Sequence, residues 1–368
     1  MKLLERTRTP RAAQGPRLGE SVVNTDGHVI GLDIGATAVR AAILSPARDG
    51  EPGMSLNDLG EAELPVGTVV DGVVAEPAEL TRALAALWKA HDFGCRNVVI
   101  GVSNPQVVVR AMTMPRLSRD QQAKALPYRA KDIVAMPLDQ ALLDFQELGP
   151  VEGEPDNVSG LLIAAPRQPV LTAVRAVEAA GLRIVRVDLS SFATLRSTAA
   201  AGVPCEAVVD IGAQMTTVVI HHLGIPKVVR TLPRGGQHLT ERLVDRTGAS
   251  VVEAEILKRE IGLLGGDSEV SMILNGAVRP LITDIRGSIQ YFGGSEDAAV
   301  VERISLTGGG GHLPGLVDML TEDTGVPCYL MSPLQHLRVA MDAPGGQHAD
   351  TTAAATAVSV GLAMGAAA

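Results

Sequence analysis

Two stretches of the chain share one pattern, in which an apolar run, an acidic turn and a second apolar run follow one another. They cover residues 31–44 and 208–220, and each carries Asp-Ile-Gly at its turn, at 33–35 and 210–212. Backbone N–H groups at such a turn can converge on an anion, and a nearby carboxylate can hold Mg²⁺ through water. One copy is equally typical of a plain hairpin. Two copies, about half a chain apart, predict two related half-domains that face one ligand.

The rest of the pattern predicts alternating helices and strands. Leu80, Leu84 and Leu87 fall on one face of a helix over 77–91. Further strands are expected over 61–64, 97–101, 106–112, 141–148, 227–232, 301–306 and 326–331. Further helices are expected over 190–200, 240–245, 251–261, 278–292 and 351–363.

Two segments predict more specific local structure. A strand over 160–165, a helix over 169–180 and a strand over 181–188 form one unit, whose strands we expect to pair in parallel. Ser118 is a candidate N-cap of a helix that Pro127 should kink or split.

Composition narrows the class of protein. Acidic residues (41) outnumber basic ones (32), and the formal net charge of −9 disfavours a general nucleic-acid role. Cys95, Cys205 and Cys328 lie far apart, fit no disulfide or metal framework, and are typical of free thiols. The N-terminal region is basic without an apolar run, which argues against a secretory signal, and 351–368 is too weakly hydrophobic to favour spanning a bilayer. We therefore expect a cytoplasmic protein.

Candidate chemistry outside the hairpins is less specific. Glycines at 308–311 follow a predicted strand and precede a helix, so they could let the backbone approach an anionic ligand, although a flexible linker is the alternative. The chain has no Walker Gly-Lys-Ser/Thr motif. Glu255 and Lys258 share a helix face, which is more often an ordinary ion pair. His221 and His222 point to opposite faces of a strand, so no metal site is expected there.

Taken in order along the chain, these motifs resemble the nucleotide-binding motifs of the actin-like ATPase superfamily. They are Asp33-Ile34-Gly35, then Asp210-Ile211-Gly212 with Thr216-Thr217, then 306–310 with 313–316. Within that superfamily the chain resembles the PilM family of type IV pilus assembly proteins. This resemblance covers about residues 31–365 and rests on further segments in the same order: 98–103, 114–118, 125–139, 164–166, 178–182, 187–188 and 232–240.

The resemblance implies an α/β, two-lobed actin-like (ribonuclease H-like) ATPase fold with an inserted subdomain of the FtsA/PilM type. Residues 1–27 would form a flexible tail. The other implied parts are a first lobe core (28–104 and 160–200, with 351–368 near the cleft), the inserted subdomain (105–159), a second lobe core (201–235 and 300–350) and a helical subdomain of the second lobe (236–299).

The resemblance also implies that ATP and Mg²⁺ bind in the cleft. Asp33 and Asp210 would organise a hydrated Mg²⁺. The remaining nucleotide-binding positions would line the phosphates (Gly35, Thr37, Gly212, Thr216), back the adenosine (Gly308, Gly309, Gly310) and flank its ribose and base (Glu255, Lys258). Arg40, at a position where relatives usually have Lys, is the last of these implied nucleotide-binding residues.

Two departures from the superfamily pattern bear on catalysis. Ala36 replaces a Ser that many relatives carry, and Ala213 replaces an acid that hydrolysing actins carry. Phosphoryl transfer depends mainly on positioning and charge stabilisation, so we expect slow or negligible ATP turnover.

In PilM relatives the inserted subdomain helps to bind the cytoplasmic N-terminal tail of the inner-membrane protein PilN. By that resemblance Met114, Tyr128 and Met136 are candidate groove residues, and the protein would be peripheral at the inner face of the membrane, reached only through partners. Self-association is compatible with the resemblance.

Two alternatives remain open at this point. A sugar- or acetate-kinase-like phosphotransferase needs a general base, for which Asp188 is the only obvious acid, and capping of the helix at Ser190 explains that residue equally well. An FtsA-like cell-division scaffold would end in an amphipathic membrane helix, which this C-terminus does not resemble.

Overall fold

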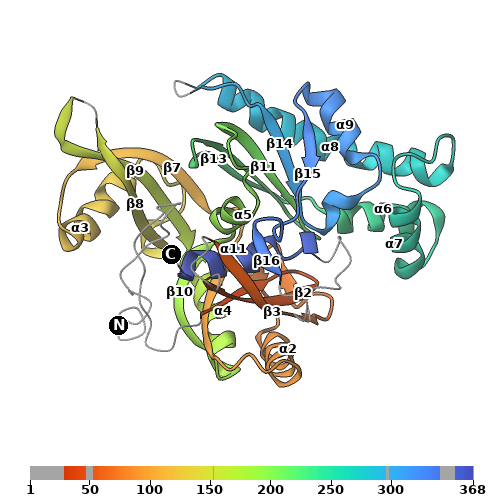
Figure 1. Ribbon diagram of the computed structural model, residues 1–368, viewed down its shortest axis with the longest axis horizontal. Coiled ribbons are helices and arrows are strands. Elements are labelled where there is room, and N and C mark those ends of the chain that lie inside the picture. The colour runs from red at the N-terminus through yellow and green to blue at the C-terminus, as the bar shows by residue number, and fades with distance from the viewer. Residues whose placement is uncertain (1–28, 47–52, 152, 296–297, 340–352, 368) are drawn as a thin grey trace.

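Two mixed β-sheets of matching strand order form the centre of the molecule (Figure 1). The computed structural model describes residues 29–46, 53–151, 153–295, 298–339 and 353–367. The first sheet has the order β10-β6-β1-β2-β3-β16, formed by β1 (Ile30–Ile34), β2 (Ala38–Pro46), β3 (Met54–Glu63), β6 (Asn97–Val102), β10 (Arg183–Leu189) and β16 (Leu337–Val339). The second has the order β13-β12-β11-β14-β15, formed by β11 (Cys205–Ile211), β12 (Thr216–His222), β13 (Ile225–Leu232), β14 (Arg303–Thr307) and β15 (Cys328–Leu330).

The sheets repeat one topology around the two acidic hairpins. β1 pairs antiparallel with β2 and parallel with β6, and β11 pairs in the same way with β12 and β14. The outer neighbours also match. β3 pairs antiparallel with β2 as β13 does with β12, and β10 pairs parallel with β6 as β15 does with β14. The duplicated sequence pattern is therefore a duplicated five-strand topology. The predicted two-lobed α/β fold is confirmed.

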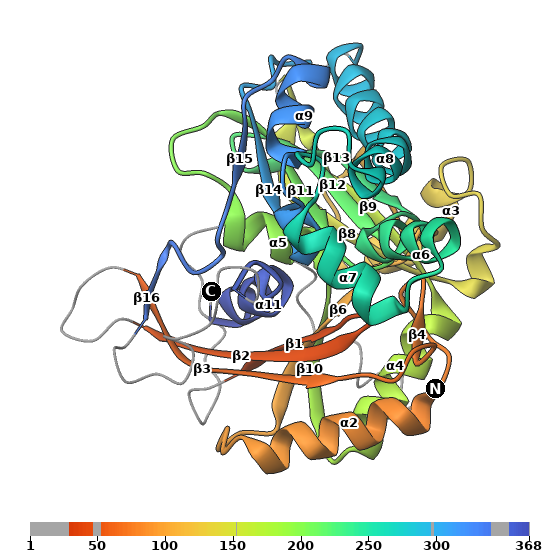
Figure 2. The same ribbon diagram turned by 90° about the vertical axis from the view of Figure 1, so that its right-hand side faces the viewer.

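Helices cover both faces of the first sheet. α2 (Pro77–Ala90) and α4 (Arg167–Ala179) lie on one face, and α11 (Ala357–Ala367) lies on the other (Figure 2). The leucines of α2 that were predicted to share a face are all buried: Leu80, Leu84 and Leu87. α5 (Ser190–Thr198) packs along α11 between the lobes. A short hairpin, β4 (Val69–Val70) with β5 (Val73–Val74), extends the first lobe.

The second sheet is covered by helices from the later part of the chain. They are α6 (Gly236–Thr247), α7 (Val251–Glu260), α8 (Glu269–Gly293) and α9 (Leu316–Thr324), with the 3-10 helix η3 (Gly309–His312) after β14. Their apolar faces and the sheet share one core, in which Leu243, Leu274, Ile285 and Phe292 are fully buried. α8 begins at Glu269, nine residues before its predicted start at 278, and its N-cap Ser268 accepts from the Ser271 N–H through its hydroxyl.

A third sheet forms a subdomain beside the lobes. Its antiparallel order is β7-β9-β8, from β7 (Val108–Pro115), β8 (Ala141–Val151) and β9 (Glu154–Pro166). One face packs on α3 (Arg119–Ala130), and the 3-10 helix η2 (Leu138–Gln140) leads into β8. The other face packs on Leu189, Phe192 of α5 and Val229 of β13, so the subdomain touches both lobes.

Two local predictions are wrong. Residues 160–165 do not pair with 181–188, because they belong to β9 in the antiparallel third sheet, while β10 pairs with β6. Pro127 does not split its helix, because α3 continues to Ala130. Pro127 lies in the last turn of α3 and is exposed. Its missing N–H removes one hydrogen bond near the end of the helix, with only three helical residues after it.

The implied domain boundaries stay a proposal. The boundary between 159 and 160 falls inside β9. The tail 1–27 and residues 340–350 lie outside the described residues. Within the described residues, no helix combines the length and the apolar character that crossing a membrane requires.

Candidate functional site

The two acidic hairpins place their carboxylates by the same local geometry. Asp33 lies near the end of β1 and Asp210 near the end of β11, and each precedes a tight turn. The Gly35 N–H donates to the Ala38 carbonyl at 3.0 Å, and the Gly212 N–H donates to the Met215 carbonyl at 2.9 Å. Equivalent strands and equivalent turns therefore present one carboxylate from each lobe.

Both carboxylates line one cavity of about 1070 Å³ between the lobes. The other predicted nucleotide-site residues that line it are Gly35, Thr37, Arg40, Gly212, Glu255, Lys258, Gly308, Gly309 and Gly310. The structure thus brings together residues from four separate parts of the chain.

Thr216 is the predicted position that does not line the cavity. Its side chain is fully buried and its hydroxyl donates to the Arg234 carbonyl at 2.8 Å. Successive residues of a strand point to opposite faces, so Thr217 takes the place at the cavity wall. The prediction was one residue out of register, because alternation alone does not say which face of β12 meets the cavity.

Burial changes the acidity of both carboxyls. Loss of solvent raises the pKa of Asp33 to about 7, assisted by the charge of Asp210 and opposed by the Arg40 guanidinium. Loss of solvent likewise raises the pKa of Asp210 to about 6, opposed by the hydrogen bond from the Thr194 hydroxyl at 3.3 Å and by Arg40. Arg40 is itself held by Glu61, with Nε 2.7 Å from Oε2. A cation between the carboxyls would replace the protons that burial favours.

The glycine run after β14 packs tightly against the second hairpin. Gly308 has φ of +81°, and a Cβ there would lie 2.3 Å from Asp210 Oδ1 and 2.5 Å from the Ile211 carbonyl oxygen. A Cβ at Gly310 would lie 2.5 Å from Ile211 Cγ2. Gly308 and Gly310 therefore have no room for a side chain, whereas a Cβ at Gly309 would meet nothing within 4 Å. The run packs on the second hairpin and continues as η3, so the linker interpretation is wrong.

Lys258 is buried and Glu255 is half-buried, and they belong to a hydrogen-bond network instead of a solvated ion pair. The Lys258 ammonium has three partners within 3.0 Å: the Gly236 carbonyl, Thr240 Oγ1 and Glu255 Oε2. An ammonium has three N–H donors, so this contact set uses them all and fixes α7 against the start of α6. Burial opposes the charge on Glu255, but the hydrogen bonds from Lys258 and Thr240 outweigh it and hold the pKa of Glu255 below its usual value.

Sequence reasoning missed several residues at the cavity. Thr194, on the hydroxyl-rich α5 just before the second hairpin, bonds to Asp210. Gln214 and Gln237 line the cavity, and the only sequence signal for Gln214 is its place at the hairpin turn. The kinase candidate Asp188 lies elsewhere: it is 3% exposed, with Oδ2 held by Arg196 at 2.5 Å and Oδ1 by the Leu189 N–H.

The three candidate partner residues occupy different environments. Met114 is 1% exposed in the core between α3 and the third sheet, and the half-buried Met136 packs against the same core. Tyr128 on α3 is 84% exposed. Of the three, only Tyr128 has a largely exposed side chain, because Met114 is on the face of β7 that α3 covers and Met136 is half-buried.

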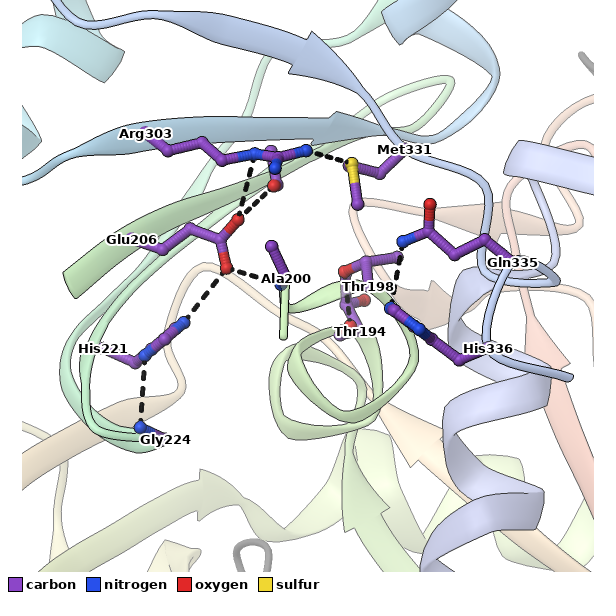
Figure 3. Close-up of polar contacts among 11 residues, drawn as sticks. Thr194, Thr198, Ala200, Glu206, His221, Gly224, Arg303, Met331, Gln335 and His336 are labelled. Carbon is purple, nitrogen blue, oxygen red and sulfur yellow. Dashed lines mark hydrogen bonds and ion pairs between the residues drawn. The ribbon is translucent and has the colours of Figure 1, made fainter. Parts of the chain in front are cut away.

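A second polar cluster lies inside the second lobe, away from the cavity (Figure 3). Glu206, four residues before Asp210 on β11, contacts His221 Nε2 at 3.2 Å and the Ala200 N–H at 2.9 Å, and accepts from the Ser305 hydroxyl. Arg303 Nε lies 3.6 Å from its other oxygen. The cluster joins β11 to β12, β14 and the segment after α5, and so anchors the strand that carries Asp210.

Comparison with known proteins agrees with this geometry. The family model "Type IV pilus assembly protein PilM" matches residues 31–367. A solved PilM–PilN type IV pilus biogenesis complex is 27% identical with a TM-score of 0.79, covering 92% of this chain and 98% of that one.

One more distant solved structure shares the fold, and one curated protein matches part of the sequence. The structure of MreB5 of Spiroplasma citri bound to ADP has a TM-score of 0.50 at 13% identity, covering 91% of this chain and 95% of that one. The cell division protein FtsA of Bacillus subtilis is 22% identical over 268 residues, 65% of this chain, and the match spans only 59% of its own length.

Proposed function

The chain belongs to the type IV pilus assembly protein PilM family, and from this premise we propose that it is a nucleotide-binding assembly scaffold of a type IV pilus machine. It would hold Mg²⁺-ATP between its lobes and dock the cytoplasmic tail of a PilN-like membrane protein, and so act at the inner face of the membrane. The observation that carries the nucleotide site is the shared cavity: two equivalent hairpins, one in each lobe, direct Asp33 and Asp210 into it.

The residues of the cavity fit a magnesium nucleotide. Asp33 and Asp210 supply oxygen ligands of the kind that hydrated Mg²⁺ prefers. Gly308 and Gly310 let the run pack against the second hairpin, and a Cβ at Gly309 would meet nothing within 4 Å, so the backbone there is open to a ligand. Bound Mg²⁺ would supply the positive charge that offsets the triphosphate.

A scaffold fits this cavity better than a phosphotransferase. Asp188 is bound by Arg196 and does not line the cavity, so it is not placed to act as a general base. Asn104, which does line it, uses its amide within the first lobe, because Nδ2 donates to the Asp71 carbonyl and Oδ1 accepts from the Gln106 N–H. Slow turnover follows if neither group activates a nucleophile.

The nucleotide proposal is tested with a fluorescent ATP analogue in Mg²⁺ and in EDTA, together with a phosphate-release assay. We expect binding that weakens in EDTA and very slow release of phosphate. Turnover stimulated strongly by a sugar or a carboxylate would support a phosphotransferase instead.

The partner proposal rests on the PilM–PilN complex that the chain resembles and on the exposed Tyr128 of α3. A synthetic PilN-type tail peptide should bind the protein, and Tyr128→Ala should weaken that binding about tenfold, as expected for an aromatic contact residue. Tyr291→Ala is the matched control, because Tyr291 is 66% exposed on α8 in the second lobe. Equal losses from both variants would contradict a docking site on the subdomain.

A further inference from the structure

A direct hydrogen bond crosses the cavity from one lobe to the other. The backbone N–H of Asp71, in the turn between β4 and β5, donates to Gln214 Oε1 at 3.0 Å. Gln214 lies in the turn between β11 and β12, next to the predicted phosphate-lining Gly212. Figure 2 shows the β4 hairpin on the same side of the molecule as α6 of the second lobe. Residues 71 and 214 both belong to cavity-forming turns.

The first-lobe side of this contact is rigidly held. Asp71 and Gly72 both have positive φ, at +48° and +75°. A Cβ at Gly72 would lie 1.8 Å from the Ser103 carbonyl oxygen, so the turn sits directly on the segment after β6. Asn104 Nδ2 also donates to the Asp71 carbonyl at 3.3 Å. These contacts fix the direction in which the Asp71 N–H points.

The second-lobe side is positioned by α6. Gln214 Nε2 donates to Gln237 Oε1 at 3.3 Å, and the Gln237 N–H donates to the Ala213 carbonyl at 2.8 Å. Gln237 Nε2 in turn donates to Glu241 Oε1 at 2.8 Å. The Gln214 amide is therefore oriented by its own lobe, with Oε1 directed at the first lobe. Met215 supports the approach, because its Cε lies 3.0 Å from where a Cβ of Gly72 would be.

We propose that Gln214 is a latch that closes the cavity over its ligand and sets the rate of nucleotide release. Two other hydrogen bonds near the cavity come through the helices between the lobes. Thr194 of α5 bonds to Asp210, and Gly308 N–H donates to the Ala354 carbonyl just before α11. The Asp71–Gln214 bond instead joins the two cavity turns themselves. In this proposal the nucleotide leaves when the lobes separate, and separation of the two turns breaks this bond.

The latch rests on the proposed nucleotide site. Loss of one neutral hydrogen bond should speed release about three- to tenfold. Association should change less, because the open state already lacks the bond. Gln214→Met removes both amide contacts and keeps the length of the side chain. Gln237→Ala leaves the bond but loosens its orientation, and should speed release less.

The test is a stopped-flow chase of a fluorescent ATP analogue from the full-length protein in Mg²⁺. Gln290→Ala is the control, an exposed glutamine on α8. Faster release from Gln214→Met, with the control unchanged, supports the latch. Release at the wild-type rate from Gln214→Met, with normal binding, overturns the latch and leaves the nucleotide site standing. Failure of the wild-type protein to bind the analogue overturns the nucleotide site and the latch with it.

Discussion

Burial of Asp33 and Asp210 disfavours their ionised forms, and this effect raises the pKa of both carboxyls. Their pKa values of about 7 and about 6 arise mainly from loss of solvent, and the charge of Asp210 also raises the pKa of Asp33. Two buried carboxyls with raised pKa values do not stabilise the fold at neutral pH. Their presence fits the proposed cationic ligand, which would need them ionised.

The same pKa values predict a pH-dependent affinity for Mg²⁺-ATP. The carboxyls must lose their protons to hold the cation, so affinity should rise between pH 5.5 and about 7.5 and then level off. The ligand-free protein should behave in the opposite way. Because the folded pKa values exceed the ordinary 3.8, these groups favour folding most below about pH 4 and lose that contribution as pH rises towards 7. Calorimetry across this range checks the first expectation, and a flat affinity would contradict it.

The contribution of Glu206 to the stability of the fold should have the opposite pH dependence. Burial opposes its charge, but hydrogen bonds from His221, Ser305 and the Ala200 N–H outweigh that and hold the pKa of Glu206 below its usual 4.5. Its stabilising effect is therefore present above about pH 4.5 and is lost as pH falls through the lowered pKa. Glu206→Gln should reduce the free energy of unfolding by about 1–3 kcal/mol at pH 7.

Urea denaturation at pH 7 and pH 4 checks this expectation. The difference between Glu206→Gln and wild type should narrow at the lower pH. Glu322→Gln on α9 serves as an exposed control. A constant difference across pH would mean that the charge of Glu206 plays no part.

The packing of α11 leaves no room for added side-chain atoms at two glycines. A Cβ at Gly361 would lie 1.8 Å from the Ala193 carbonyl oxygen of α5, and a Cβ at Gly31 of β1 would lie 2.0 Å from the Ser359 carbonyl oxygen. Both close contacts involve backbone, which cannot move aside as a side chain can. α11 therefore packs on α5 through its own Gly361 and on β1 through Gly31 of that strand.

Gly361→Ala should destabilise the protein by about 1–3 kcal/mol, the usual cost of overpacking. Gly276→Ala is the matched control, because it also lies inside a helix, α8, and a Cβ there would meet nothing within 4 Å. The control should stabilise the protein by up to about 1 kcal/mol, through helix propensity. Thermal unfolding of both variants decides the matter. Equal shifts in the same direction would contradict close packing of α11.

Elements with a strong local pattern could be predicted from the sequence, and elements defined by distant partners could not. The helix at 77–91 and both acidic hairpins follow from apolar spacing and turn chemistry. β16 has three residues and exists through pairing with β3, nearly 300 positions earlier, which no local pattern shows. The pairing of 160–165 failed for a different reason. This segment pairs with β8, the strand directly before it, and with β7, instead of with the strand that follows the helix.

The residues of the candidate site also fall into two groups, those that the sequence predicts and those that only the structure shows. Its acids and glycines stand in motifs that the chain repeats, so they could be found from the sequence. Thr217, Thr194 and Gln214 depend on strand facing and on contacts across the molecule. Those contacts become visible only once both lobes are in place.

At the scale of the whole molecule, the subdomain with sheet β7-β9-β8 contacts both lobes. One face of its sheet packs on Leu189 and on Phe192 of α5, and it reaches Val229 at the edge of the second sheet. A ligand that moves one lobe against the other must disturb this apolar contact. The proposed partner site and the proposed nucleotide site are thus connected through packed side chains.

The central claim is that the two lobes hold one magnesium nucleotide through one carboxylate each. Its most direct test is a double-mutant cycle on Mg²⁺-ATP affinity, measured by calorimetry for Asp33→Asn, Asp210→Asn and the pair. Carboxylates that share one cation should be coupled by at least about 1 kcal/mol, so that the second substitution costs much less than the first. Additive losses, or an affinity that neither substitution changes, would contradict a shared site.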